Sequence, residues 1–235
     1  QLSRRLRDST AIVMESANEP ALDRAQHSML DKLHKQLIHE STHDHLTGLI
    51  NRRAFERSLD AKLSQQCEET YQDVRCHLDI DQFNIINSTY GYDAGDKILI
   101  DFTNLLLRTL NGNGLLARIN GNSYTLLLEN QTAADARKII QNQINTLENF
   151  QFQWQDKELR ISMNIGMVPI TDYEATASEL LRTAEISCRT AKEKGSNNIH
   201  VYQRNDKEAA LNQNIIRQVL QIENTIKNGN IELFC

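Results

Sequence analysis

Two kinds of hydrophobic pattern alternate along this chain, and together they predict a layered α/β architecture. Short, nearly continuous apolar runs bounded by polar or turn residues are typical of buried strands. Longer stretches with apolar residues three and four positions apart are typical of helices packed on one face. Strands are expected at residues 74–80, 115–119, 124–128, 150–154, 159–168 and 199–202. Helices are expected at residues 96–110, 132–150 and 177–194.

Residues 1–43 contain no glycine and form a separate amphipathic segment. Charged residues fill the gaps between apolar positions spaced by three, four and seven, which predicts a long N-terminal helix of the coiled-coil or signalling type. A helix that packs on its own domain is the alternative. The apolar positions are Leu22, Met29, Leu30, Leu33 and Leu37.

The other end of the chain predicts a linker and the start of another domain at residues 205–235. A helix is expected at 206–229, and residues 231–235 begin a strand that has no partner here. We therefore expect this chain to be a fragment of a longer protein, whose other parts could include a membrane anchor.

The composition argues against nucleic acid and membranes as binding partners and indicates the cellular location. The net charge of −5 argues against a broad basic surface for nucleic acid. No apolar run approaches the roughly 18 residues of a membrane helix, so no direct membrane contact is expected. The cysteines show no C-x-x-C spacing, which favours a reducing, cytoplasmic location without disulfides. They are Cys67, Cys76, Cys188 and Cys235.

Four blocks of residues, in order, carry more specific information. Residues 44–53 read D-x-L-T-G-L-x-N-R-R, and residues 79–96 contain D-I-D-x-F, then N, Y-G and G-D. Residues 161–166 read I-S-M-N-I-G, and Ala191-Lys192 precedes Gly195. This series resembles the GGDEF family of diguanylate cyclases.

The resemblance implies a nucleotidyl-cyclase-like fold over residues 44–204, with a central, mostly antiparallel sheet flanked by helices. Active members pair two GTP-loaded domains, and each 3′-hydroxyl attacks the α-phosphate of the other GTP to give cyclic di-GMP. The chemistry needs metal ions that neutralise the phosphates. Mg²⁺ with GTP is therefore the expected cofactor if nucleotide binds.

The hairpin that names the family departs from its pattern. Residues 120–124 read Asn-Gly-Asn-Ser-Tyr where Gly-Gly-Asp/Glu-Glu-Phe is expected, and Arg118 fixes the register. Asn122 replaces the acid that ligates magnesium, and an amide is a weak ligand and no base. No intact catalytic set is expected in this degenerate hairpin, which comprises Asn120, Gly121, Asn122, Ser123 and Tyr124.

Other positions of the family's nucleotide site are retained. Asn87 and Asp96 match the pair that reads guanine in the family. Such a pair suits guanine because a carboxylate can accept two hydrogen bonds from the edge of the base. A turn residue and a helix N-cap are the structural alternatives for these two. Phe83 and Lys192 match further nucleotide-site residues. Asp79 and the backbone of Ile80 match metal ligands, with Asn122 as a weak third.

Two further departures from the family pattern are expected to weaken the binding of phosphate and of the product. Asn84 and Ser196 stand where the family has cations. Asn111 and Gly114 replace the Arg-x-x-Asp pair of the product-inhibition site, so cyclic di-GMP is not expected to bind there.

Residues 39–43 read H-E-S-T-H, a formal match to the zinc-protease motif. A third ligand would have to come from a residue such as Glu68 or Glu69, which nothing positions. Chance is therefore the favoured explanation of this motif.

The C-terminal thirty residues resemble the entry to an EAL domain, the cyclic di-GMP phosphodiesterase family. The favoured hypothesis is a catalytically inactive GGDEF domain that regulates its own adjacent EAL domain, binds GTP and forms a homodimer through its N-terminal helix. A weakly active diguanylate cyclase and a ligand-free dimerisation scaffold are the alternatives.

Overall fold

The computed structural model describes residues 29–65, 72–171 and 175–203. The chain divides into two compact units between His43 and Asp44. In the first unit, residues 29–42 form a helix. The expected helix at 206–229 and strand at 231–235 lie outside the described residues, as does the leader before residue 29. No helix in the described part is long and apolar enough to cross a membrane.

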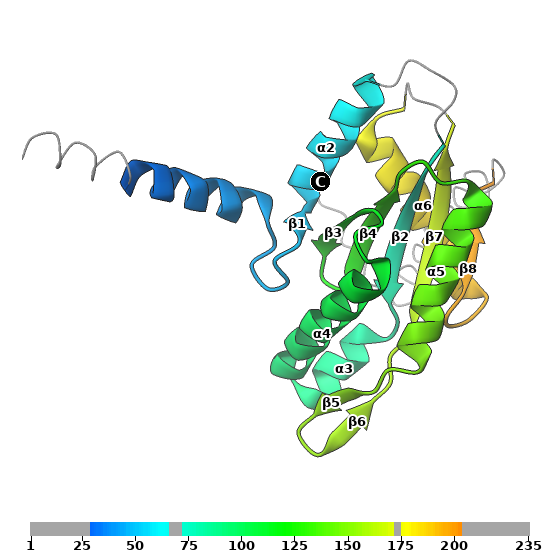
Figure 1. Ribbon diagram of the computed structural model, residues 1–235. Coiled ribbons are helices and arrows are strands. Elements are labelled where there is room, and N and C mark those ends of the chain that lie inside the picture. The colour runs from blue at the N-terminus through cyan, green and yellow to red at the C-terminus, as the bar shows by residue number, and fades with distance from the viewer. Residues whose placement is uncertain (1–28, 66–71, 172–174, 204–235) are drawn as a thin grey trace, which may run out of the picture. The chain divides into compact units, whose positions relative to one another are not determined.

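The second unit is built on a six-stranded sheet (Figure 1) with the order β1-β3-β4-β2-β7-β8. Only the β1/β3 and β7/β8 pairs are parallel, so the expectation of a mostly antiparallel sheet is confirmed. Strands β5 and β6 form a separate hairpin. The strands are β1 (Ile50–Asn51), β2 (Asp73–Ile80), β3 (Leu115–Asn120), β4 (Ser123–Leu128), β5 (Phe152–Trp154), β6 (Lys157–Leu159), β7 (Met163–Ile170) and β8 (Ile199–Val201).

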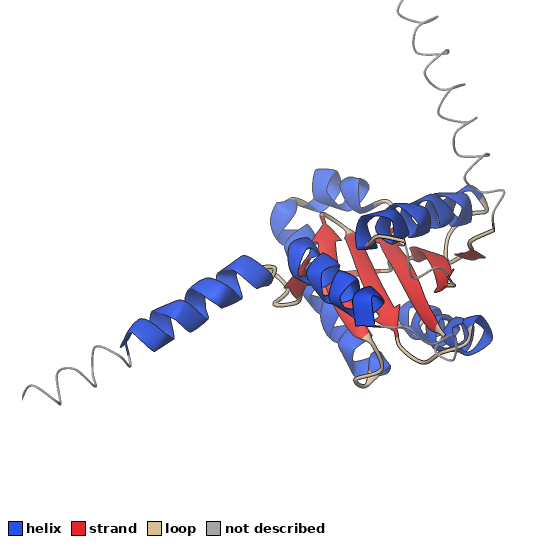
Figure 2. Ribbon diagram, turned by 90° about the horizontal axis from the view of Figure 1, so that it is seen from above, coloured by secondary structure: helices blue, strands red, loops and turns tan. Residues whose placement is uncertain are grey.

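Helices cover both faces of this sheet (Figure 2), as the alternation of patterns predicted. One core lies beneath α3, α4 and α5 and includes Leu78 and Phe102. The other lies beneath α2 and α6 and includes Phe55 and Leu181. The helices are α2 (Arg52–Gln65), α3 (Phe83–Tyr90), α4 (Tyr92–Leu110), α5 (Ala133–Glu148) and α6 (Ala177–Glu193).

Helix α6 lies unusually close to β7, and a glycine makes this possible. A Cβ added to Gly166 would lie 2.2 Å from the carbonyl oxygen of Ala184 and 2.2 Å from the backbone nitrogen of Cys188. The start of α6 is fixed by a capping box, in which Thr176 and Glu179 each accept a hydrogen bond from the other's backbone N–H. The helix that carries Lys192 is thereby held against the sheet.

Three expectations about the elements were wrong. The helix expected from Asp96 begins at Tyr92, and β1, α2 and α3 before it were not expected at all. The strand expected over 159–168 is two strands, because the chain leaves β6 after Leu159 and enters β7 at Met163. The Asn-Gly hairpin is tighter than expected, with only Gly121 and Asn122 between its strands.

Candidate functional site

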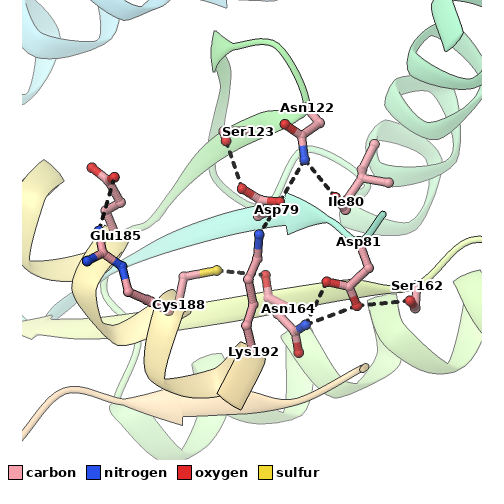
Figure 3. Close-up of polar contacts among 11 residues, drawn as sticks. Asp79, Ile80, Asp81, Asn122, Ser123, Ser162, Asn164, Glu185, Cys188 and Lys192 are labelled. Atoms are coloured by element: carbon pink, nitrogen blue, oxygen red, sulfur yellow. Dashed lines mark hydrogen bonds and ion pairs between the residues drawn. The ribbon is translucent and has the colours of Figure 1, made fainter. Parts of the chain in front are cut away.

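The candidate metal and phosphate site lies at the end of β2, where three elements meet (Figure 3). Strand β2 brings Asp79 and Ile80, the β3/β4 hairpin brings Asn122 and Ser123, and α6 brings Lys192. The antiparallel register places Asp79 directly opposite Ser123. The structure therefore brings together the residues that the sequence assigned to metal and phosphate binding.

Asp79 is already fully engaged by its neighbours. The Asn122 side-chain nitrogen donates to Asp79 Oδ1 at 2.7 Å and to the carbonyl oxygen of Ile80 at 2.6 Å. Lys192 Nζ lies 2.7 Å from Asp79 Oδ1, and the Ser123 hydroxyl donates to Oδ2 at 3.0 Å. A lysine ammonium and an amide N–H₂ thus occupy the oxygens that the resemblance gives to a cation.

This donor set fits a resident magnesium ion poorly. Mg²⁺ prefers several oxygen ligands, usually with one or two carboxylates, but Asp79 is the one acid among these five residues. Within the described residues, no three His, Cys, Asp or Glu side chains gather as a metal site. A cation at this point would have to displace both Asn122 and Lys192 from Asp79.

The second acid of the motif has a different role. Asp81 accepts hydrogen bonds from the Ser162 hydroxyl at 2.9 Å and from the Asn164 amide at 2.8 and 3.0 Å. Figure 3 shows it directed toward these two residues rather than toward Asn122. Asp81 therefore joins the end of β2 to the start of β7.

A second group of expected residues meets where α3 packs against α4. A Cβ added to Gly95 would lie 2.0 Å from Asn87 Oδ1 and 3.0 Å from Phe83 Cζ, so these three positions are in close contact. Asp96 follows Gly95 and is exposed. Asn87 Oδ1 is buried and has no hydrogen-bond partner in the described part of the chain. This orphaned acceptor suits a donor from a bound ligand.

The structural alternatives for this pair are wrong. Helix α4 has Gly91 as its N-cap, so Asp96 lies inside the helix and caps nothing. Asn87 lies within α3 and is not a turn residue. Asn87 and Asp96 therefore have neither of these two structural roles.

Arg118 holds the hairpin in place. Its Nη1 lies 2.9 Å from Asp44 Oδ1, and its Nε and Nη2 donate to the carbonyl oxygen of Gly121 at 3.0 and 2.7 Å. Thr47 donates two further hydrogen bonds to Asp44. Burial alone would raise the pKa of Asp44, but the bonds from Thr47 and the Arg118 guanidinium outweigh it and lower the pKa.

We expect Asp44→Asn to destabilise the domain by about 2 kcal/mol at pH 7, because it removes a charge-assisted hydrogen bond to Arg118. A lowered pKa in the folded state means that this contribution is present above the ordinary value of 3.8 and is lost as the pH falls through the folded pKa. Urea unfolding at pH 7 and pH 3 should show a larger difference from wild type at pH 7. The exposed substitution Asp156→Asn is the control, and an equal loss from both would contradict this role.

Sequence reasoning missed two polar residues of β2. The run 74–80 was interpreted as apolar, but Arg75 and His77 are buried within it. Both lie on the same face of the strand as Asp79, since alternate residues share a face. Burial, followed by the charges of Arg75 and Lys192, lowers the pKa of His77 to about 3. The alternation of polar residues at 75, 77 and 79 was the signal that could have found them.

The formal zinc motif has no metal-site geometry in the described part. The rings of His39 and His43 stack with centroids 4.0 Å apart. His43 Nδ1 lies 2.8 Å from the Thr42 hydroxyl and 3.2 Å from the carbonyl oxygen of His39. The two residues considered as a third ligand, Glu68 and Glu69, lie outside the described residues.

The position of the family's product-inhibition site is a shallow cavity of about 380 Å³. It is lined by Gly112, Asn113 and Gly114 together with Glu129 from the end of β4. Its lining within the described residues includes an acid and no lysine or arginine.

A sheet covered by helices on both faces, with an acid at the end of β2 opposite a tight hairpin, defines a nucleotidyl-cyclase-like domain. The model of the GGDEF diguanylate cyclase domain matches residues 41–198. This chain therefore belongs to the GGDEF family.

Several proteins of this family are similar to the chain. It is 31% identical over 202 residues to the cyclic di-GMP phosphodiesterase PdeB of Shewanella oneidensis, covering 86% of this chain and 23% of the relative. It is 32% identical over 173 residues to the probable diguanylate cyclase DgcE of Escherichia coli, covering 73% and 16%. The chain thus spans less than a quarter of the length of these relatives.

Solved structures agree on the fold. The coiled coil and GGDEF domain of DgcB from Caulobacter crescentus, in complex with c-di-GMP, gives a TM-score of 0.71 at 20% identity, covering 77% of this chain and 96% of that one. The GGDEF domain of PA1120 (TpbB or YfiN) from Pseudomonas aeruginosa gives 0.66 at 28% identity, covering 72% and 99%. Both structures share the fold described above.

Proposed function

We propose that this GGDEF domain is a regulatory module that binds GTP and does not cyclise it. The observation that carries the proposal is the Asn122 amide, which donates to both Asp79 Oδ1 and the Ile80 carbonyl oxygen. Cyclisation needs carboxylates that hold metal and a group that assists the attacking hydroxyl. An amide supplies neither, and Asp79 is neutralised by Lys192.

The guanine would lie against α3 and α4. The exposed Asp96 carboxylate can accept two hydrogen bonds from the guanine edge, and the unpartnered Asn87 Oδ1 can accept another from the same base. Adenine lacks this pair of donors, so the pocket should favour GTP over ATP. Phe83 provides an apolar contact beside Asn87.

Mg²⁺ would arrive with the nucleotide in this proposal. Phosphate oxygens supply most of its ligands, with Asp79 as the acid available from the protein. Lys192, whose side chain is 39% exposed, is free to turn from Asp79 toward the phosphates. GTP binding would then break the ion pair that joins α6 to β2, which is a means of signalling occupancy.

The proposed partners lie outside the described domain. The similarity to the cyclic di-GMP phosphodiesterase PdeB supports a neighbouring EAL domain that this module regulates. A homodimer through the N-terminal helix is supported by its exposed apolar side chains. These are Met29, Leu30, Leu33, Leu37 and Ile38.

Calorimetric titration of the chain with GTP in Mg²⁺, with ATP as control, tests the proposal. Saturable binding of GTP, none of ATP and no cyclic di-GMP in the same sample are expected. Accumulation of cyclic di-GMP would favour the alternative that the domain is a weakly active cyclase. The retained Asp79 and Ile80 support that alternative. The absence of any heat of binding at millimolar GTP would favour the remaining alternative, a dimerisation scaffold that binds no ligand.

A further prediction concerns the metal. Without nucleotide, Mg²⁺ in place of a chelator should leave the unfolding temperature of the wild type unchanged, because Asn122 and Lys192 occupy Asp79. Asn122→Asp should lower stability in chelator by about 1–2 kcal/mol, since it replaces two hydrogen bonds with repulsion between carboxylates.

Mg²⁺ should restore the stability of Asn122→Asp by binding between the two acids. The exposed loop substitution Asn113→Asp adds the same charge elsewhere and should show no such recovery. A wild type that gains as much from Mg²⁺ as Asn122→Asp would show that Asn122 does not block the site.

A further inference from the structure

A cavity of about 420 Å³ lies on the sheet face covered by α2 and α6. Three different elements each contribute an arginine to it: Arg52 from the start of α2, Arg75 from β2 and Arg182 from α6. Sites for small molecules usually measure about 300–1,000 Å³, so this volume can hold more than a single small ion.

Arg75 is the unusual member of this lining. It is 0% exposed, and its Nη1 donates to the carbonyl oxygens of Leu180 at 2.6 Å and Leu181 at 3.0 Å. Its Nε and Nη2 are buried and have no partner among the described residues. A buried guanidinium with unused donors is costly to the fold unless an acceptor satisfies it.

Two acids, Asp79 and Glu185, also line the cavity. Asp79 at one end is engaged by Lys192, Asn122 and Ser123. Glu56 pairs with Arg52 at 2.8 Å, and Glu185 lies 4.0 Å from Arg189. Burial lowers the pKa of Arg75, whereas the charges of Glu185 and Glu56 favour its protonated form and so raise the pKa, but neither acid forms a hydrogen bond with it.

Arg182 adds a second available cation. It lines the cavity, and no ion pair joins it to an acid in the part of the chain that the structure describes. With Asp79 held by Lys192, the lining offers more positive than negative charge to a ligand. Two guanidinium groups from β2 and α6 can then bind one anion from two sides.

We infer that this cavity is an oxyanion site, separate from the Asn87 and Asp96 pocket, that takes the phosphate group of a small phosphorylated molecule. The adjacent Nε–H and Nη2–H of Arg75 form the fork of donors that matches two oxygens of a phosphate. Arg182 closes on the anion from α6. The inference does not depend on GTP binding.

Thermal unfolding in a phosphate-free buffer at constant ionic strength provides the test. Inorganic phosphate at about 100 times its Kd should raise the unfolding temperature by about 5 °C or more. Arg75→Met should abolish the shift. Arg160→Met, which removes an exposed arginine in the loop between β6 and β7, should keep it.

Because Arg75→Met changes the core, a second variant is needed. Arg182 is exposed, so Arg182→Gln should fold normally and weaken phosphate binding about tenfold, the effect of losing one charged hydrogen bond. No shift in wild type, or an equal shift in wild type, Arg75→Met and Arg182→Gln, would overturn the inference.

GMP and AMP separate the two sites. AMP binding that Arg182→Gln weakens and Asp96→Asn leaves unaffected is the expected result for the arginine cavity, and GMP should bind there in the same way, beside any binding that Asp96→Asn removes. Binding of GMP that Asp96→Asn abolishes and Arg182→Gln leaves intact would assign the phosphate to the guanine pocket and overturn the inference.

Discussion

Gly166→Ala should destabilise the domain by about 3 kcal/mol or more, which is the largest loss of stability that we expect from one methyl group. The added Cβ would lie 2.2 Å from two backbone atoms of α6, at Ala184 and Cys188. Backbone cannot rotate away as a side chain can, so the whole helix must move outward. Overpacking of this kind usually costs about 1–3 kcal/mol, and the double clash places it at or above the upper end.

Urea unfolding measures this loss, and Gly48→Ala is the matched control. Gly48 also has a special backbone, with φ of 70°, but nothing lies within 4 Å of a Cβ there. Its replacement should therefore cost only about 1–2 kcal/mol, from the left-handed conformation alone. Equal losses from the two substitutions would mean that α6 does not pack on β7 as closely as described.

Asp96→Asn should weaken GTP binding about a hundredfold, the largest functional effect that we expect. The carboxylate loses two charge-assisted hydrogen bonds to guanine, and about 3 kcal/mol corresponds to a hundredfold in affinity. The fold should be unaffected, because Asp96 is exposed within α4 and caps no helix. Calorimetry with GTP measures the affinity directly.

Asp101→Asn is the control for this experiment. It lies on the same helix and removes the same charge, and its exposed pair with Lys97 is of the kind worth about 0.5 kcal/mol. GTP affinity should be unchanged in this variant. If Asp96→Asn and Asp101→Asn bind GTP equally well, Asp96 does not read guanine and the proposed pocket is wrong.

The central strands β2, β3 and β4 could be predicted from sequence because they carry strong local signals. Helix α3 could not, since it is a single short helix with Asn84, Asn87 and Ser88, residues of modest helix propensity, and it follows Gln82 in a left-handed conformation. Its packing against α4 stabilises it. The early start of α4 was hidden in the same way, because Gly91 and Gly95 indicate a loop until their tertiary contacts are known.

The sequence indicated which residues come together at the candidate site, but it did not indicate which hydrogen bonds they form. The family motifs located Asp79, Asn122 and Lys192, which are far apart in sequence. That Asn122 donates to both Asp79 and Ile80 depends on the two-residue turn and the β2/β4 register, which no local pattern specifies. The unpaired donors of Arg75 could not be foreseen either, since hydrogen-bond satisfaction is a property of the folded core.

The place of β2 at the middle of the sheet also has a kinetic consequence. Its two neighbours come from far along the chain: Asp79 pairs with Ser123 on one side and with Asn164 on the other. Pairings of such long range make folding slow, because loop closure must precede the contacts that reward it. During synthesis, both edges of β2 remain unpaired until β4 and β7, which come later in the chain, have been made. Until β7 emerges from the ribosome, one edge stays open to pairing with other chains, which is the interval when this domain is most prone to aggregate.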